Sequence, residues 1–254
     1  MKSKTVFNGK GLVTAILCGI FLVANLAAIG GGGRRRAKEA LCLSNLRQWG
    51  VVYEMFADDH EGRFCTGFWY QLYPYYRDFK LLLCPSATVP HSDSHRGGKF
   101  EAWVVQGGLP ADWGRQDVLG SYGANGHVGG AGMKYTSSQT DWLTVGLKGA
   151  DRAPVLLDGA RGGVPRVVDQ PPEYDGQIYY GYDPKYGTPD INEIRNFCIN
   201  RHNGGVNCLF LDFSARKVGL KELWVLKWHR EWPDDIVLPE WPEWMQDFKD
   251  YSGE

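Results

Sequence analysis

The sequence predicts an α-helical N-terminal part followed by a β-rich body. Residues 11–33 of the 254-residue chain carry no formal charge and are mostly apolar, as in a helix that crosses a membrane. Residues 34–62 continue with apolar side chains at helical spacing. Beyond them, short apolar or aromatic segments alternate with turn residues, and the chain holds 33 Gly and 13 Pro. This composition favours a turn-rich β structure over a helical bundle.

The N-terminal residues 1–33 are expected to form a leader and a transmembrane helix. Lysines 2, 4 and 10 precede the apolar segment, whose densest part is residues 12–29. A helix of about 23 residues is about 34 Å long, which is enough to cross a hydrocarbon core of about 30 Å. The segment ends at Gly30–Gly33, which weaken a helix. Two alternatives remain open, a secretory signal peptide cleaved near Gly30 and a buried helix of a soluble protein.

Residues 34–62 are expected to form a soluble stem helix. A spacing of three and four residues places one stripe on a single face, formed by Leu43, Leu46, Gly50, Tyr53 and Ala57. This stripe requires a partner surface. The helix is expected to end in the acidic turn at residues 58–62, because Gly62 favours a C-terminal stop.

Residues 63–254 are expected to form one β-rich body with an acidic, aromatic tail. The predicted strands are Glu101–Val105, Ser121–Gly123, Pro154–Leu157, Gln177–Tyr182, Asn196–Arg201, Asn207–Asp212 and Ala215–Val218. A hairpin is expected around Asn203–Gly205, with a short helix at Leu220–Leu226. Three tail tryptophans are expected to pack on the body, namely Trp232, Trp241 and Trp244. The net charge of −1 gives no reason to expect a nucleic-acid partner.

Several segments, taken in order, resemble a known bacterial family. They are the stem at 37–62, Trp69 with Leu72–Tyr75, Leu83–Ser86, Ser121–Asn125 and the segment 201–218, in which nine residues separate His202 from Asp212. The series resembles type II secretion G-like pseudopilins. More narrowly, it is similar to the prepilin-type proteins with a His–nine residues–Asp-Gly motif that are abundant in planctomycete-like bacteria.

The resemblance implies an α+β pilin-like fold, in which a long N-terminal helix packs its second half on an antiparallel sheet. It implies a non-enzymatic structural or minor subunit of a type II secretion or type IV pilus-like assembly. The chain would cross the inner membrane once through residues 12–29, with its N-terminus cytoplasmic and its body periplasmic or extracellular. Its partners would be other pseudopilin or pilin subunits. Prepilin peptidase would cut after Gly11, and Leu12 would then be methylated.

Two positions differ from the family pattern. Ile16 stands where the leader usually has Glu, which leaves open whether the chain is cleaved and whether filaments form. Phe213 stands where the motif has Gly, so we expect the strand to continue through this position. The motif residues are expected to be structural: His202, Gly204, Gly205, Asn207 and Asp212. On a hairpin, His202 and Asp212 would lie about 20 Å apart, too far for acid–base catalysis.

Six cysteines occur in the chain. A disulfide between Cys42 and Cys84 would tie the stem to the body, and one between Cys198 and Cys208 is the alternative. The spacings do not resemble a zinc site, so no metal ligands are expected there.

The remaining candidates for chemistry are weak. Asp58, Asp59 and Glu61 offer oxygen ligands for calcium, although a solvated helix end is the simpler explanation for them. No other cofactor is expected. The rival function is a secreted or membrane-anchored glycan- or surface-binding module with a pilin-like leader.

Overall fold

The computed structural model describes residues 31–65, 71–92, 96–108, 116–129, 140–179, 181 and 191–251. The residues from Glu39 onward form one compact unit, which includes most of the predicted stem as well as the body. The predicted leader lies outside the described residues, apart from residues 31–33. In the described part of the chain, no helix is both long enough and apolar enough to cross a membrane.

The predicted stem is confirmed as helix α2, Gly32–Asp59. Its buried residues are Cys42, Leu46, Trp49, Gly50, Val52, Tyr53, Phe56 and Ala57. Leu41 is exposed, whereas the neighbouring Cys42 is buried on the packed face of the helix. The helix ends where Glu61 and Gly62 adopt positive φ angles, and the Gly62 amide bonds to the Ala57 carbonyl.

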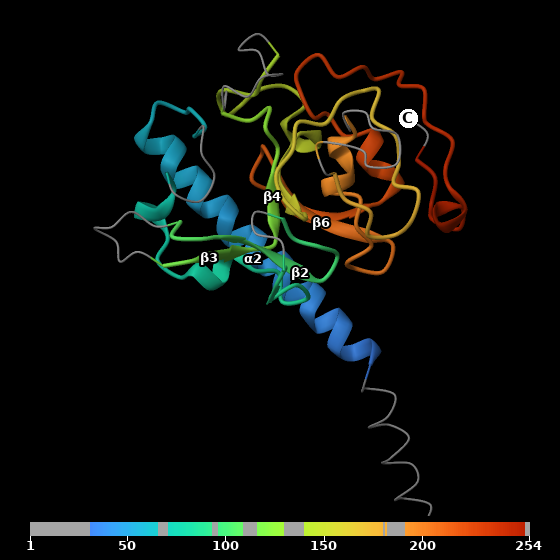
Figure 1. Ribbon diagram of the computed structural model, residues 1–254. Helices are drawn as coiled ribbons and strands as arrows, with labels where there is room; N and C mark the ends of the chain where they lie inside the picture. Colours follow the sequence, from blue (N-terminus) through green and yellow to red (C-terminus); the bar gives the residue numbers. More distant parts are fainter. Residues whose placement is uncertain are drawn as a thin grey trace, which may run out of the picture. The chain divides into compact units, whose positions relative to one another are not determined.

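Two sheets follow, so the chain has an α+β fold (Figure 1). The first has the order β1-β2-β3, with β1 (Val89–Pro90) parallel to β2 (Glu101–Val105) and β2 antiparallel to β3 (Val118–Gly120). The second is antiparallel, with the order β4-β5-β6-β7: β4 (Tyr122–Ala124), β5 (Pro154–Asp158), β6 (Gly205–Phe210) and β7 (Ala215–Gly219).

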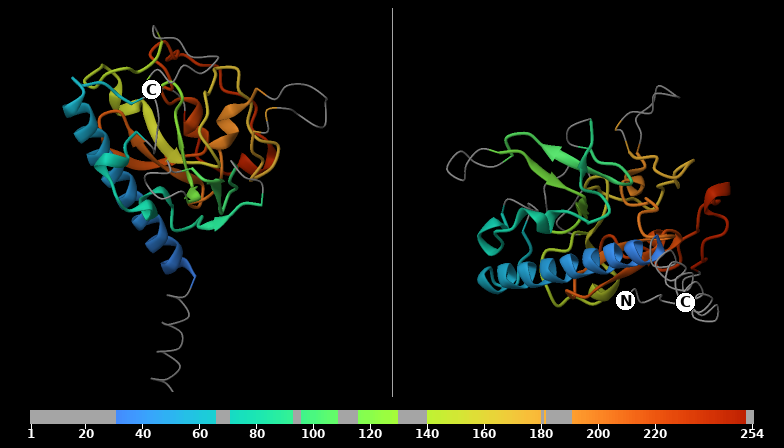
Figure 2. Two further views of the ribbon diagram at one scale, coloured as in Figure 1. Left: turned by 60° about the vertical axis from the view of Figure 1, so that its left-hand side comes forward. Right: turned by 90° about the horizontal axis from the view of Figure 1, so that it is seen from below.

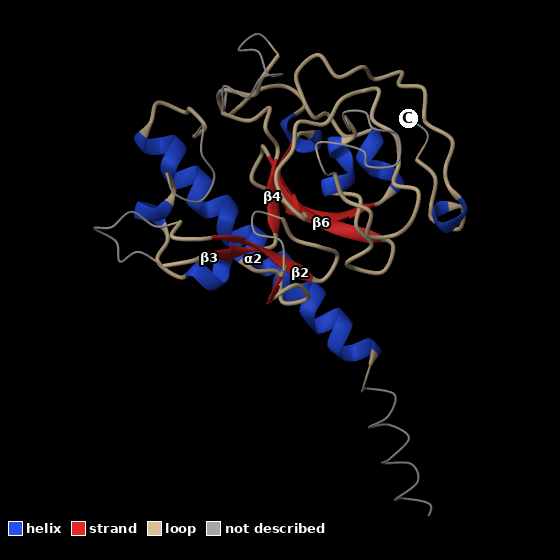
Figure 3. Ribbon diagram, in the orientation of Figure 1, coloured by secondary structure: helices blue, strands red, loops and turns tan. Residues whose placement is uncertain are grey.

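Short 3-10 helices and loops join these elements (Figure 3). The 3-10 helices are η1 (Tyr73–Tyr75), η2 (Phe79–Leu82), η4 (Ala150–Arg152), η5 (Glu193–Asn196), η6 (Lys221–Trp224) and η7 (Glu243–Met245).

The central strands β5 and β6 of the four-stranded sheet are buried on both faces. Successive residues of a strand point to opposite faces, so Leu209 packs in the cluster that contains α2, while Cys208 and Phe210 pack in the other. Figure 2 shows α2 along one side of this sheet and the C-terminal segments on the other. The second cluster contains apolar residues of the predicted short helix Leu220–Leu226. Trp232 lies in this cluster, and Trp241 and Trp244 pack against it, as predicted.

The predicted hairpin around Asn203–Gly205 is wrong. Residues 196–201 form no strand, because β5 and β7 already occupy both edges of β6. Asn196 instead ends η5, and the following residues continue in a turn closed by bonds from the Phe197 and Cys198 amides to the Ile194 carbonyl. The described part of the predicted strand 177–182 is also irregular.

The hairpin of this region joins β6 to β7. Its turn contains Phe213, at a φ of 65°, and the Phe210 amide bonds to the Ser214 carbonyl. The expectation that the strand continues through Phe213 is therefore wrong. A non-glycine residue here carries the strain of the left-handed conformation, which a glycine would avoid.

Candidate functional site

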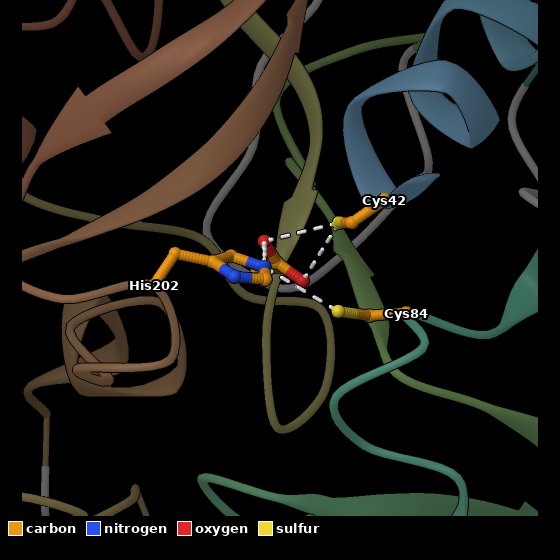
Figure 4. Close-up of side chains that lie close together, drawn as sticks. Cys42, Cys84 and His202 are labelled. Atoms are coloured by element: carbon orange, nitrogen blue, oxygen red, sulfur yellow. Dashed lines mark hydrogen bonds and ion pairs between the residues drawn. The ribbon is translucent and has the colours of Figure 1, made fainter. Parts of the chain in front are cut away.

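Four ionisable side chains converge in the interior from four separate segments. They are Cys42 of α2, Cys84 after η2, Asp158 at the end of β5, and His202 in the loop before β6. One ligand atom from each lies within 4.8 Å of the other three. Figure 4 shows the side chains of Cys42, Cys84 and His202 pointing toward a common centre. All four residues are buried, and His202 is the most exposed at 4%. We call them the buried tetrad.

Local structure fixes each side chain. Cys42 lies one turn before Leu46 on the buried face of α2. The Cys84 amide donates a hydrogen bond of 2.6 Å to the Ser121 hydroxyl. Asp158 shares the α2-facing side of the sheet with Leu156, two residues earlier. The backbone of His202 is held by a bond from its amide to the Gly205 carbonyl.

The distances inside the buried tetrad are short. His202 Nε2 lies 3.0 Å from Asp158 Oδ2 and 3.4 Å from Cys84 Sγ. Cys42 Sγ lies 3.4 Å from the same carboxylate oxygen of Asp158. One imidazole nitrogen therefore faces two acceptors at once, although it carries at most one proton.

A second layer of groups holds the Asp158 carboxylate. The Arg201 side chain is fully buried, and its Nη1 donates to Asp158 Oδ1 at 3.1 Å. The remaining Arg201 donors bind the carbonyls of Gly98, Lys99 and Ser121. The backbone amide of Asn207 donates to Asp158 Oδ2 at 2.8 Å.

The interactions shift the pKa values of the tetrad in different directions. Burial raises the pKa of the Cys42 thiol well above its usual value. Burial alone would raise the pKa of Cys84 also, but hydrogen bonds with Cys42 and His202 lower it to about 7. Burial would lower the pKa of His202, yet its hydrogen bonds to Asp158 and Cys84 raise it to about 9.

The pKa of the Asp158 carboxyl falls well below its usual range. Burial opposes this shift, but the hydrogen bond from His202 and the charge of Arg201 outweigh it. The carboxylate is therefore available as an anionic ligand over the whole physiological pH range.

A groove of about 820 Å³ lies beside the buried tetrad and does not include it. Its lining includes Val51 and Met55 of α2, together with Leu83 and Pro85 on either side of Cys84. None of the four tetrad residues lines the groove. Within the described part of the chain, the tetrad is buried and presents no open face to a substrate.

The structure brings two predicted residues together, because Cys42 and Cys84 both belong to the tetrad. Both are free thiols, so their disulfide is not formed and stays a prediction for an oxidised chain. The alternative partners Cys198 and Cys208 are also free thiols. The cysteine spacings gave no reason to expect metal ligands, yet the structure places Cys42 and Cys84 in a group of side chains that could hold a metal ion.

The motif residues divide between two places. His202 and Asn207 lie at the tetrad, where Asn207 also donates from its side chain to the Glu39 carbonyl. Gly204 has a φ of 84°, and Gly205 opens β6. Asp212 accepts hydrogen bonds from the Ser214 amide and hydroxyl in the β6–β7 turn.

The weak calcium candidates do not gather into a site. Asp58, Asp59 and Glu61 are exposed at the end of α2, and Asp59 accepts a hydrogen bond from Tyr75. They are absent from the one group of potential metal ligands found among the described residues. Gly11, Leu12 and Ile16 lie outside the described residues.

Sequence reasoning did not identify Asp158 and His202 as partners of the two cysteines. Asp158 is 116 residues from Cys42, and His202 is 118 residues from Cys84, so no local motif links them. The available signal was a charged residue at the end of an apolar strand, PVLLD, which indicates a carboxylate at the edge of a core.

Comparison of the chain with protein-family models, with curated proteins and with solved structures finds no match.

Proposed function

We propose that the chain is a non-enzymatic, pilin-like subunit of a bacterial envelope assembly. The observation that carries the proposal is the packing of α2 on the antiparallel sheet, directly after an uncharged segment of 23 residues. In this arrangement the leader anchors the chain, the second half of the helix docks the body, and subunits pack side by side.

The chemistry of the buried tetrad favours a structural role. A relay of thiol, imidazole and carboxylate requires the imidazole to use one nitrogen toward the nucleophile and the other toward the carboxylate. Here Nε2 of His202 faces both Cys84 and Asp158. The tetrad is also closed, so a thiolate there has no substrate within reach.

The outer face of α2 supports contact with other subunits. Leu41, Val51 and Met55 are exposed apolar residues of the helix. Val51 and Met55 border the 820 Å³ groove, whose other wall is formed by residues 75–88. An apolar helix face next to a groove suits packing against a neighbouring subunit.

The first test is the intact mass and N-terminal sequence of the protein isolated from native envelopes. A chain that begins at methylated Leu12 supports the proposal. A chain that begins near Gly31 indicates an ordinary signal peptide, and the secreted binding module then becomes the better assignment.

A second test maps the subunit contact. A photoreactive residue at Val51 is expected to cross-link the chain to itself or to a pilin-like subunit in native envelopes. Val237 in the C-terminal tail is the matched control, because it is 90% exposed and lies outside the groove. Equal cross-linking from both positions would contradict the assignment of the helix face.

A further inference from the structure

We propose that Cys42, Cys84, Asp158 and His202 form a structural zinc site. The inference is independent of the proposed envelope function, because it depends only on the chemistry and geometry of these four side chains.

The donor set selects the metal. Two thiolates, one imidazole and one carboxylate are the ligand types that Zn²⁺ takes in tetrahedral protein sites. Calcium and magnesium prefer oxygen ligands, so the two sulfur atoms disfavour them. Four protein ligands with no space for a substrate are typical of a structural zinc site, whereas catalytic sites keep one position open.

The distances fit a tetrahedron around zinc. Bonds of about 2.3 Å to sulfur and about 2.0–2.1 Å to nitrogen or oxygen separate tetrahedral ligand atoms by about 3.3–3.8 Å. The separation of Cys84 Sγ from His202 Nε2 is 3.4 Å, and that of Cys42 Sγ from Asp158 Oδ2 is also 3.4 Å. The third separation, from His202 Nε2 to Asp158 Oδ2, is 3.0 Å. All six separations lie within 4.8 Å, so the ligand atoms would move by at most about 1 Å to accept the ion.

The charges also balance. Two thiolates and the Asp158 carboxylate carry three negative charges, and the buried Arg201 supplies one positive charge against them. A divalent cation at the centre makes the buried site neutral when His202 is the neutral ligand. A neutral site avoids the large cost of burying an unpaired charge.

The surrounding hydrogen bonds orient the ligands as in known metal sites. Arg201 and the Asn207 amide hold the carboxylate of Asp158. The Tyr122 hydroxyl lies 3.4 Å from Cys42 Sγ and can donate to its thiolate. Such outer contacts fix ligand orientation and raise metal affinity.

Zinc binding and the predicted disulfide exclude each other. The metal requires both sulfur atoms as thiolates, whereas a disulfide between Cys42 and Cys84 removes two ligands at once. The oxidation state of these two cysteines in the native protein therefore distinguishes the two assignments.

The experiment uses the full-length chain, purified in mild detergent with reductant, first stripped of metal and then titrated with Zn²⁺ or Co²⁺. We expect one tightly bound zinc per chain. We expect cobalt to give the visible absorption of a tetrahedral ion together with a thiolate-to-metal charge-transfer band in the near ultraviolet. Zinc should also raise the unfolding temperature, because it binds only the folded site.

The variants are Cys84→Ala and His202→Ala, with Cys198→Ala as the matched control. Cys198 is an equally buried free thiol outside the tetrad. We expect the two tetrad variants to weaken zinc binding by at least about a hundredfold, since changes in outer contacts alone cost about 10–100-fold. The control should bind zinc like the parent chain. Near-ultraviolet circular dichroism establishes that each variant is folded.

The titration of the parent chain is decisive even if a variant fails to fold. A folded, reduced parent chain that takes up no stoichiometric zinc overturns the proposal, as does bound cobalt without a thiolate band. A Cys42–Cys84 disulfide in protein isolated from native envelopes also overturns it.

Discussion

Replacing Arg201 by methionine should destabilise the protein severely. The side chain is fully buried and donates to Asp158 Oδ1 and to the carbonyls of Gly98, Lys99 and Ser121. Removing one partner of a buried ion pair costs about 3–5 kcal/mol, because the other charge stays buried without compensation. The three carbonyls also lose donors, so the expected loss lies at the upper end of that range.

The measurement is urea unfolding of the full-length chain, followed by tryptophan fluorescence in the presence of a chelator. Arg201→Lys is the second variant: it keeps the charge but has fewer donors, so it should fall between methionine and arginine. Arg216→Met is the matched control, because Arg216 pairs with Glu222 at 2.6 Å but is 43% exposed. Exposed pairs contribute about 1 kcal/mol or less. The reasoning is refuted if Arg201→Met and Arg216→Met lose the same free energy of unfolding.

Three further predictions concern other parts of the body. Burial raises the pKa of Asp169 to about 7 in the folded chain, above the pKa of about 4 in the unfolded chain. The folded state therefore binds the proton more tightly, and the stability that this gives is fully present below pH 4 and is lost as the pH rises through 7. Urea unfolding at pH 5 and pH 8 should therefore show a loss of roughly 3 kcal/mol with increasing pH that Asp169→Asn removes, and an equal slope in both proteins would contradict this. Phe213→Gly should be about 1 kcal/mol more stable than Phe213→Ala. Both variants lose the aromatic ring, but only glycine accepts the φ of 65° without strain. The reverse order of unfolding midpoints would exclude strain at this turn. Gly50→Ala should lower the melting temperature by the equivalent of about 1–2 kcal/mol. The new Cβ would lie 2.9 Å from the Phe213 carbonyl oxygen, and this clash exceeds the gain in helix propensity of about 1 kcal/mol. A higher melting temperature would show that the β6–β7 turn moves to accept the methyl group.

Local sequence patterns predicted the elements whose shape depends on their own residues. The spacing of Leu46, Gly50 and Tyr53 was sufficient for α2, and runs of apolar residues were sufficient for β5 and β6. The error at 196–201 has a different origin. Its side chains suit a strand, but β6 has only two edges. The next strand along the chain, β7, fills one edge, and the more distant β5 fills the other.

The site shows the same limit more clearly. The expectation that Cys42 lies near Cys84 came from the need to tie the helix to the body, and the structure places them together. Nothing local indicated that Asp158 and His202 join them, because each ligand comes from a different element. The tertiary fold brings these four residues together, and their spacing in the sequence matches no known metal-binding motif.

The burial of α2 against β5 and β6 also sets the order of events when the chain is made. Leu46 packs in one cluster with Leu156 and Leu209, which leave the ribosome more than a hundred residues later. The helix can form early from its own residues, but its apolar face stays open until almost the whole chain has been synthesised. Contacts so distant in sequence make folding slow. The body can therefore close around the helix only after the last strands have been synthesised.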